Sequence, residues 1–223
     1  MKTLIIGCHT GGIGDAVEEF LHSIDQVFTP TIKGLNVAAP TSIERYLRDN
    51  GPFDRIVYSA GVSQLKWIKD LLWIDLDRVL DVNLSGAIML ASAHVRMFPE
   101  HPVRYAVVVS DAAHTPMRGS IAYCVSKAGL EMAVKVMARE LAPLWTVVAV
   151  SPGVVDDTGM TNQLAEDIPK FRGWNPMQAR AYEDSSSVLG RRVTKREVAE
   201  TVLFALTGPQ ALNGSTITIN GGK

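Results

Sequence analysis

The 223-residue chain has little of what marks several classes of protein. It has two cysteines, Cys8 and Cys124, in no paired metal-binding or redox spacing. This argues against a disulfide scaffold and suits a reducing, cytoplasmic location. No apolar run approaches the ~20 residues that a membrane span needs, and the one after Lys2 is too short for a signal peptide core. The net charge is −1, so neither nucleic acid nor a membrane surface is an expected partner. The five histidines form no ligand cluster, and no metal site is predicted.

Short apolar segments alternate with segments of helical periodicity. The predicted strands are apolar on both faces, which is typical of strands inside a parallel sheet covered by helices on each side. A chain of this length has the size of one domain. The sequence therefore predicts an α/β fold, a doubly wound parallel sheet of the Rossmann type, as a single domain over residues 1–223. The predicted strands span residues 3–6, 25–29, 55–60, 105–110, 146–151 and 215–220.

Helices are predicted between these strands. Apolar residues recur at helical spacing from Ala16 to Ile24, and long helices are expected over 75–98 and 120–142. The pairs Thr41–Glu44 and Thr194–Glu197 have the spacing of a capping box, which marks the start of a helix.

The segment 156–192 differs from the rest of the chain because it is polar and carries no strand pattern. We interpret it as an excursion from the fold, a substrate loop that covers a site. The basic residues Arg191, Arg192, Lys195 and Arg196 surround the start of the last helix, and we expect them to form a solvated face.

Residues 7–14, GCHTGGIG, hold four glycines between the first strand and the first helix. In a doubly wound sheet this turn binds dinucleotides, because glycines let the backbone approach the pyrophosphate and the helix N-terminus supplies unpaired N–H donors. Any tight turn recruits glycine, however, so the glycines alone leave two interpretations open.

Tyr123 and Lys127 lie four residues apart in the predicted helix 120–142, which places both side chains on one face. A nearby cation lowers the pKa of a phenol from about 10 toward neutrality, where it can exchange protons. Ser110 ends the preceding strand, at the sheet edge where ligands bind. Asn83 is a polar residue in an apolar stretch, and such a residue is usually satisfied structurally. The spacing of Tyr123 and Lys127 also arises by chance.

These pieces together resemble the short-chain dehydrogenase/reductase family, in order and over essentially the whole chain. The motifs that carry the resemblance are GCHTGGIG (7–14), YSAG (58–61), NLSG (83–86), Ser110, Tyr123 with Lys127, SPG (151–153) and INGG (219–222).

The resemblance implies a role for each catalytic candidate. Tyr123 would be the general acid/base, and Lys127 its electrostatic partner and a ligand of the nicotinamide ribose. Ser110 would position the substrate oxygen, and Asn83 would hold a water in a proton relay through Lys127. The nicotinamide would carry the hydride while the protein supplies orientation and proton handling.

Two loops depart from the family pattern. The glycine loop fits neither register cleanly, so we predict one extra residue, with Gly7, Gly12 and Gly14 as the functional glycines. After SPG, Asp157 stands where the family has a threonine, and we assign that role to Thr158 together with the Val155 backbone. The other predicted cofactor contacts are His9, Thr10, Ile13, Thr29, Asn36, Ala60 and Gly61, besides Tyr123 and Lys127.

The end of the second strand usually selects the cofactor, because an acidic residue there binds the ribose hydroxyls of NAD. Here the strand ends Phe28-Thr29-Pro30-Thr31, with Lys33 close behind and His9 in the glycine loop. His9 and Lys33 also fit as ordinary exposed residues. Since no carboxylate is present to repel a 2′-phosphate, we predict NADP in preference to NAD.

The sequence thus predicts an NADP-dependent oxidoreductase that interconverts a ketone and an alcohol. The resemblance of the helices 75–98 and 120–142 to those that pair subunits in the family implies a homodimer or homotetramer. The alternative is a non-catalytic NAD(P)-binding sensor or scaffold, which has no need of Ser110 or Tyr123. An adenosyl-methionine methyltransferase would leave the Tyr–Lys helix unexplained. No residue pattern identifies the substrate.

Overall fold

A computed structural model describes residues 1–185 and 187–223, so Ser186 of the predicted excursion lies outside the described residues. The predicted α/β fold is confirmed: six parallel strands form one sheet in the order β2-β1-β3-β4-β5-β6. The strands are β1 (Lys2–Ile6), β2 (Gln26–Phe28), β3 (Arg55–Tyr58), β4 (Val103–Val108), β5 (Trp145–Pro152) and β6 (Thr216–Ile219). The helices are α1 (Ile13–Leu21), α2 (Pro40–Asn50), α3 (Trp73–Leu80), α4 (Gly86–Met97), α5 (Ile121–Glu140), α6 (Gly159–Arg172), α7 (Pro176–Asp184) and α8 (Lys195–Thr207).

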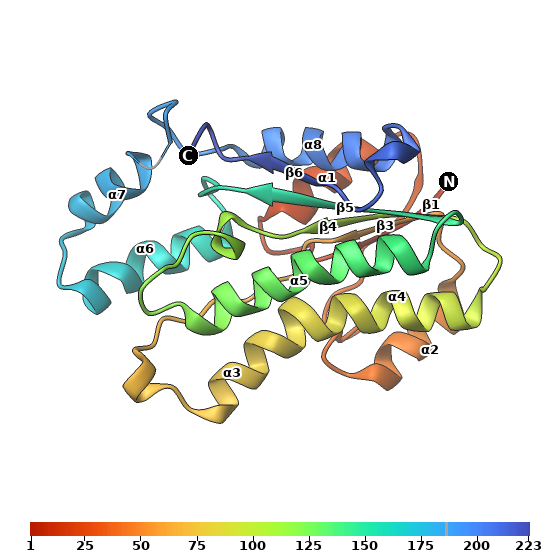
Figure 1. Cartoon of the computed structure of the whole chain (residues 1–223), viewed down its shortest axis with the longest axis horizontal. Helices are drawn as coiled ribbons and strands as arrows, with labels where there is room; N and C mark the ends of the chain where they lie inside the picture. The colour runs from red at the N-terminus through yellow and green to blue at the C-terminus, as the bar shows by residue number, and fades with distance from the viewer. Residues whose placement is uncertain (186) are drawn as a thin grey trace.

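The strand order reverses at β1, which pairs with β2 on one side and with β3 on the other. In open parallel sheets, ligands bind in the crevice beyond the carboxyl ends of the strands at such a reversal. The glycine loop follows β1 at this point. In Figure 1 the strand arrows run toward the end of the molecule that carries α6 and α7.

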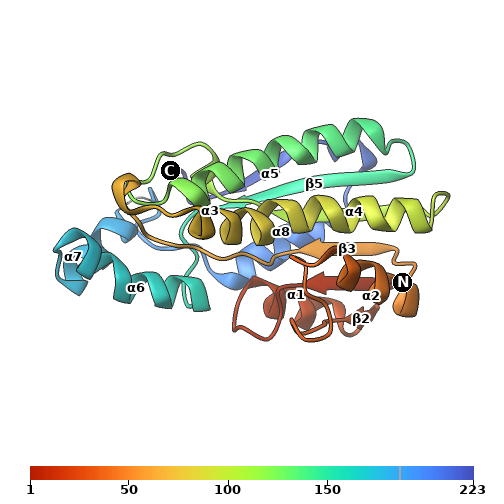
Figure 2. The same cartoon turned by 90° about the horizontal axis from the view of Figure 1, so that it is seen from below.

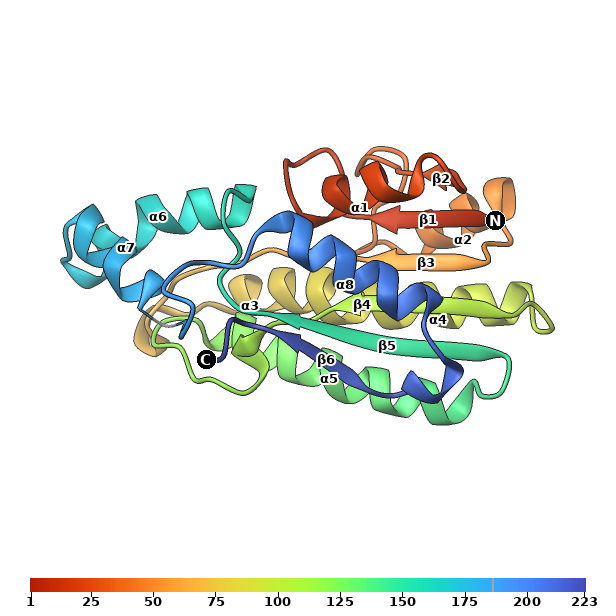
Figure 3. The ribbon, with the colours of Figure 1, turned by 90° about the horizontal axis from the view of Figure 1, so that it is seen from above.

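The two faces of the sheet bury separate apolar clusters, as expected for strands apolar on both faces. Along β5, Val147 and Ala149 belong to one cluster, while Val148 and Val150 belong to the other. Helices α2, α4 and α5 cover the first face, which is turned toward the viewer in Figure 2. Helices α1 and α8 cover the second, seen in Figure 3.

Several element boundaries differ from the sequence prediction. The first helix ends at Leu21, so Ile24 is outside it and 58% exposed. The Thr41–Glu44 capping box is wrong, because α2 already begins at Pro40, a residue with a preset helical φ. The Thr194–Glu197 box is confirmed, with Thr194 Oγ1 accepting from the Glu197 N–H at 3.2 Å. The helix predicted over 75–98 is interrupted by a π-helical turn at Asp81–Ser85.

The polar segment 156–192 contains two helices that its pattern did not predict, α6 and α7. Gly173 ends α6 with a left-handed φ of 69°, a conformation that glycine adopts readily. Both helices lie beyond the carboxyl ends of the strands (Figure 1). In the described part of the chain, no helix is both long enough and apolar enough to traverse a bilayer.

Candidate active site

The glycine loop packs too tightly for side chains at two of its glycines. A Cβ on Gly7 would lie 2.6 Å from the Ala60 nitrogen, and Gly7 has a φ of +100°. A Cβ on Gly14 would lie 2.6 Å from the Gly7 oxygen and 2.9 Å from Ser59 Oγ. The loop, the start of α1 and the end of β3 are therefore in backbone contact, which requires glycine at both positions.

Asp15, in the first turn of α1, fixes the backbone of the glycine loop by hydrogen bonds. Its carboxylate accepts N–H bonds from His9 at 2.5 Å, Thr10 at 3.2 Å and Gly12 at 2.9 Å. Burial acts to raise the pKa of Asp15, but the backbone donors outweigh it and lower the pKa below its usual value. The sequence analysis did not identify Asp15, because an aspartate three positions after a glycine is not a distinctive pattern for a residue that holds a loop.

With those amides taken by Asp15, the donors left for an anion are the N–H groups of Ile13 and Gly14. Neither has a hydrogen-bond acceptor within the described residues. The first N–H groups of a helix point outward along its axis, where the helix dipole favours negative charge. These two donors, with glycine-lined access, fit the pyrophosphate of a dinucleotide.

His9 links the glycine loop to the end of β2. Its side chain is exposed, its φ is +66°, and its Nε2 lies 2.7 Å from the Thr29 oxygen. The Thr29 hydroxyl donates to Glu18 at 3.4 Å, so a carboxylate lies near the strand end despite its absence from the strand itself. The Asn36 N–H donates to the Ser42 hydroxyl at the start of α2, and the Asn36 side chain accepts from the Ala38 N–H in its own loop.

The structure places Ser110, Tyr123 and Lys127 near one another at the carboxyl end of β4. Lys127 Nζ lies 5.8 Å from the centre of the Tyr123 ring and donates to the Val108 oxygen at 2.9 Å. Lys127 is 4% exposed, and burial lowers its pKa to about 8. Ser110 Oγ accepts from the Ala112 N–H at 3.2 Å.

The pKa of Tyr123 is raised, whereas its spacing to Lys127 predicts that it is lowered. Burial raises this pKa above its ordinary value, while a hydrogen bond with the Ser110 side chain acts to lower it. The Lys127 ammonium binds the Val108 carbonyl and is not among the groups that lower the pKa of Tyr123. The phenol is therefore protonated at neutral pH.

Asn83 lies in the π-helical turn and is completely buried. Its amide donates to the Val62 oxygen and to Ser126 Oγ, both at 3.0 Å, and accepts the Val62 N–H at 2.8 Å. A Cβ on Gly61 would lie 3.6 Å from Asn83 Oδ1 and 3.7 Å from Lys127 Nζ. Asn83 thus anchors the segment after β3, and Gly61 lies between it and Lys127.

The loop after β5 adjusts to its extra residue at Asp157, which has a φ of +52°. Thr158 follows as the N-cap of α6, where its Oγ1 accepts from the Thr161 N–H at 3.0 Å. The Thr161 hydroxyl donates to the Val155 oxygen at 2.6 Å. Lys195 Nζ bonds both Asp157, at 3.2 Å, and the Gly11 oxygen, at 3.0 Å. The two irregular loops are therefore joined through Lys195.

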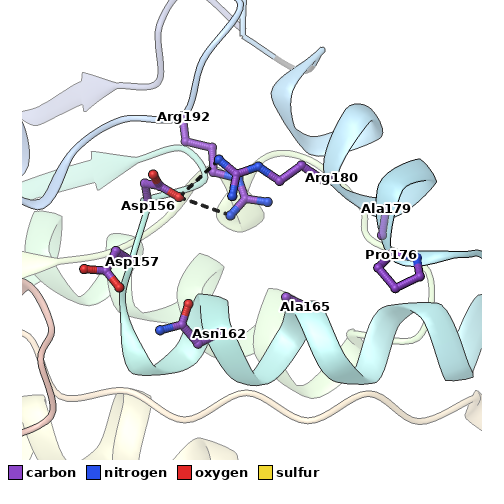
Figure 4. A pocket seen from close by; sticks show the side chains of 8 residues that line it. All are labelled: Asp156, Asp157, Asn162, Ala165, Pro176, Ala179, Arg180 and Arg192. Carbon is purple, nitrogen blue, oxygen red and sulfur yellow. Dashed lines mark hydrogen bonds and ion pairs between the residues drawn. The ribbon is translucent and has the colours of Figure 1, made fainter.

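The four basic residues expected to form a solvated face do not all do so. Arg192 is 8% exposed and bonds Asp156 at 3.3 Å and Asp184 at 3.2 Å, because α7 covers it. Arg192 and Asp156 border a cavity of about 370 Å³ between α6 and α7, shown in Figure 4. Asn162 and Ala165 line it from α6.

The amino-acid sequence of this chain is similar to those of known oxidoreductases. A family model described as enoyl-(acyl carrier protein) reductase matches residues 14–223. A 3-oxoacyl-(acyl-carrier-protein) reductase of Aquifex aeolicus is 32% identical over 173 residues, 76% of this chain and 64% of that protein. The chain thus spans a little under two thirds of that relative. An L-2,3-butanediol dehydrogenase of Corynebacterium glutamicum is 30% identical over 188 residues, 82% of this chain and 72% of that protein.

Solved structures match over nearly the whole chain. A short chain dehydrogenase family protein from Francisella tularensis superposes with a TM-score of 0.84 at 25% identity, covering 99% of this chain and 97% of that one. An aldohexose dehydrogenase of Thermoplasma acidophilum, at 22% identity, gives a TM-score of 0.85 over 99% of this chain and 93% of that one, and shows the fold alone.

Proposed function

The chain belongs to the short-chain dehydrogenase/reductase family, and on that premise we propose that it is an NADP-dependent oxidoreductase that reduces a ketone to an alcohol. The observation that carries the proposal is the cluster of Ser110, Tyr123 and Lys127 at the carboxyl end of β4, beside the glycine loop. A protein that only binds a dinucleotide does not require a protonated phenol and a serine hydroxyl at that place.

The proposed proton chemistry follows from the protonation states. The Ser110 hydroxyl holds the substrate carbonyl oxygen, and Tyr123, kept protonated by burial, donates its proton to that oxygen as the alcohol forms. Each turnover takes one proton from Tyr123, which solvent replaces, and one hydride equivalent. Lys127, with a pKa of about 8, lies close enough to stabilise the phenolate that remains. With the cofactor bound, Lys127 would bind the ribose in place of the Val108 carbonyl, and Asn83 would hold a water beside Lys127.

When bound, the dinucleotide supplies the hydride for the carbonyl carbon. The N–H groups of Ile13 and Gly14 hold its pyrophosphate, and Gly7 and Gly12 shape the approach. Thr158 and the Val155 backbone would hold the carboxamide, and Ala60 and Gly61 would border the nicotinamide ring. The adenosine end lies against the remaining candidates, Thr10, His9, Thr29 and Asn36.

The preference for NADP rests on His9 at the strand end, opposed by Glu18. The exposed His9 imidazole can donate a hydrogen bond to a 2′-phosphate, whereas the Glu18 carboxylate beside Thr29 repels it. His9→Gln should therefore lower the ratio of kcat/KM for NADPH over NADH, and Glu18→Gln should raise it. A wild-type enzyme that prefers NADH would overturn the NADP assignment and leave the reductase assignment intact.

The reductase proposal is tested by following NADPH absorbance with a panel of ketones. We expect Tyr123→Phe to lower kcat by 10² to 10⁴-fold, the usual contribution of a positioned acid, with NADPH affinity nearly unchanged. Tyr46→Phe, a half-buried tyrosine on α2, is the matched control and should retain activity. Unaltered turnover in Tyr123→Phe would exclude the proposed acid. A wild-type protein that binds NADPH but turns over no carbonyl compound would favour the sensor or scaffold.

We further propose that the chain works as a single catalytic domain with 156–192 as its substrate loop, and as a homodimer or homotetramer. Four exposed apolar residues of α5, Ile121, Val125, Met132 and Val136, are 41–58% exposed and lie on one helix face. Such a stripe is typical of a subunit contact. Sedimentation equilibrium should give two or four times the chain mass, and Val125→Glu should shift it toward the monomer. A monomeric wild type would reject the assembly.

A further inference from the structure

Helix α6 reaches the proposed catalytic face at both ends. At its start, a Cβ on Gly159 would lie 3.0 Å from the Thr10 oxygen, and Met160 Cε lies 3.6 Å from the Cβ position of Gly61. At its end, the Phe171 ring packs directly on Gly119, leaving no room for a side chain there. Met160 and Phe171 are eleven residues apart, about three helical turns, so they share one face. Helix α6 therefore lies across the site.

The contact at the far end of α6 is aromatic. The rings of Phe171 and Trp67 stack with their centres 4.4 Å apart and their planes at 21°. The Arg118 guanidinium lies 5.5 Å from the centre of the Trp67 ring. Gly119 directly precedes Ser120, the N-cap of α5, and Tyr123 follows in the first turn of that helix. We call the stacked pair Trp67 and Phe171 the aromatic latch.

One half of the aromatic latch belongs to a firmly held loop. The Lys66 N–H donates to the Gly119 oxygen at 2.8 Å. The Asp75 carboxylate binds the Lys66 ammonium and the Gln64 amide, both at 2.7 Å. These bonds restrict the movement of Trp67, which directly follows Lys66. Together with the Asn83–Val62 bonds, these contacts tie the loop that carries Trp67 to α3 and α5.

The other half belongs to a helix with room to move. Asp157 and Gly173, with φ values of +52° and +69°, border α6 at either end. Asn162 and Ala165 project from the side of α6 opposite Met160 and line the cavity of about 370 Å³ in Figure 4. When α6 moves away from Trp67, it moves into this cavity. Opening of the aromatic latch is therefore a motion of Phe171 away from a fixed Trp67.

We propose that the aromatic latch is the gate to the catalytic site and selects carbonyl compounds with a flat aromatic body. The inference rests on the proposed reductase function. Opening the gate separates two stacked rings. A flat aromatic substrate restores the stacking by lying against either ring, whereas an aliphatic substrate of equal size does not. Such a ring pair changes an equilibrium constant by about 2- to 12-fold beyond the area it buries.

The test compares two ketones with the same carbon skeleton, acetophenone and cyclohexyl methyl ketone. The quantity measured is the ratio of their kcat/KM values with NADPH. Their intrinsic reactivities differ, but this difference cancels when the ratio is compared between variants. We expect the double variant Trp67→Leu/Phe171→Leu to lower the ratio about 2- to 12-fold. Each single variant should leave the ratio unchanged, because the remaining ring still stacks on the aromatic substrate. Trp73→Leu, at a tryptophan that is 76% exposed on α3, should leave the ratio unchanged.

A binding measurement separates the gate from the chemistry. In Tyr123→Phe with NADPH bound, acetophenone should quench tryptophan fluorescence. Adding Phe171→Leu should strengthen its affinity about 2- to 12-fold, because no stacked pair then has to be separated while Trp67 still stacks on the substrate. Loss of turnover with every ketone in the wild type would reject the reductase while this binding result still decides the gate. If the acetophenone affinity is unchanged in Phe171→Leu and the kcat/KM ratio is unchanged in the double variant, both with native circular dichroism spectra, the gate is rejected.

Discussion

The sheet and the segment 156–192 are held by different forces. In the sheet, Leu4, Ile5 and Val57 are completely buried among other apolar residues. In 156–192, the buried residues that the structure describes are Thr158, Thr161, Ala179 and Arg192, three of them polar. Apolar burial is non-directional and tolerates small shifts, whereas hydrogen bonds, ion pairs and ring stacks depend on particular partners. The sheet is therefore a fixed frame, and the segment over it is a set of pairwise contacts.

Two glycines test this difference with the same substitution. Gly7→Ala should destabilise the protein by about 3 kcal/mol or more, because a positive φ is strained for alanine and the new Cβ meets the Ala60 backbone at 2.6 Å. Gly173→Ala should cost about 1 kcal/mol, since its φ is +69° and nothing lies within 4 Å of the added Cβ. Urea unfolding measures both free energies.

The same two substitutions should also differ in their effect on NADPH binding. Gly7→Ala should also abolish NADPH binding, measured by calorimetry, because Gly7 contacts both Gly14 and Ala60. Gly173→Ala should leave NADPH affinity within about twofold of the wild type. Equal losses of stability in the two variants would contradict the division between frame and segment.

The frame was predictable from the sequence and the segment was not, for the same physical reason. Period and apolarity identified all six strands, since a buried parallel strand needs no particular partner. Of the described residues in the two helices of 156–192, only Thr161 and Ala179 are buried, so no apolar stripe marks these helices. The burial of Arg192 depends on Asp156 and Asp184, which no spacing rule connects to it. The stacking of Trp67 on Phe171 joins residues about a hundred positions apart and left no local pattern.

The candidate site divides in the same way. The order of the motifs predicted where Ser110, Tyr123 and Lys127 lie. The protonation state of Tyr123 depends on its burial, and the ammonium of Lys127 binds the Val108 carbonyl, neither of which the motifs indicate. Helical spacing reports that two side chains share a face and says nothing of their other partners. The role of Asp15 was hidden for a similar reason, because the groups that donate hydrogen bonds to it are backbone N–H groups.

Lys127 gives the next largest effect, since it is a charge buried in the frame. Its pKa falls to about 8 in the folded protein from about 10.4 in the unfolded chain. Between these values the unfolded state binds more protons, so stability rises with pH through this window. Relative to Lys127→Met, whose side chain does not titrate, the wild type should gain about 2 kcal/mol between pH 7 and pH 9.5.

Urea unfolding of both proteins at the two pH values measures this difference, in which the titration of most other groups cancels. Lys135→Met is the matched control on the same helix. Lys135 is 47% exposed and paired with Glu131, so its substitution should give a difference that varies little with pH. A wild-type stability that falls relative to Lys127→Met as pH rises would mean that Lys127 is stabilised as an ammonium in the fold.

The smallest effect belongs to the ion pairs of the segment 156–192. Asp184→Asn removes a carboxylate from Arg192, whose side chain is 5% exposed, but Asp156 stays 3.3 Å away. The loss should therefore be about 1 kcal/mol, below the 3–5 kcal/mol seen when a buried charge loses its partner outright. Glu200→Gln is the control, because Glu200 and Arg196 are 51% and 75% exposed and such pairs contribute less than about 0.5 kcal/mol. Urea unfolding at low salt distinguishes the two losses. If Asp184→Asn costs no more than Glu200→Gln, the ion pair of Arg192 with Asp184 does not contribute to the stability of the fold.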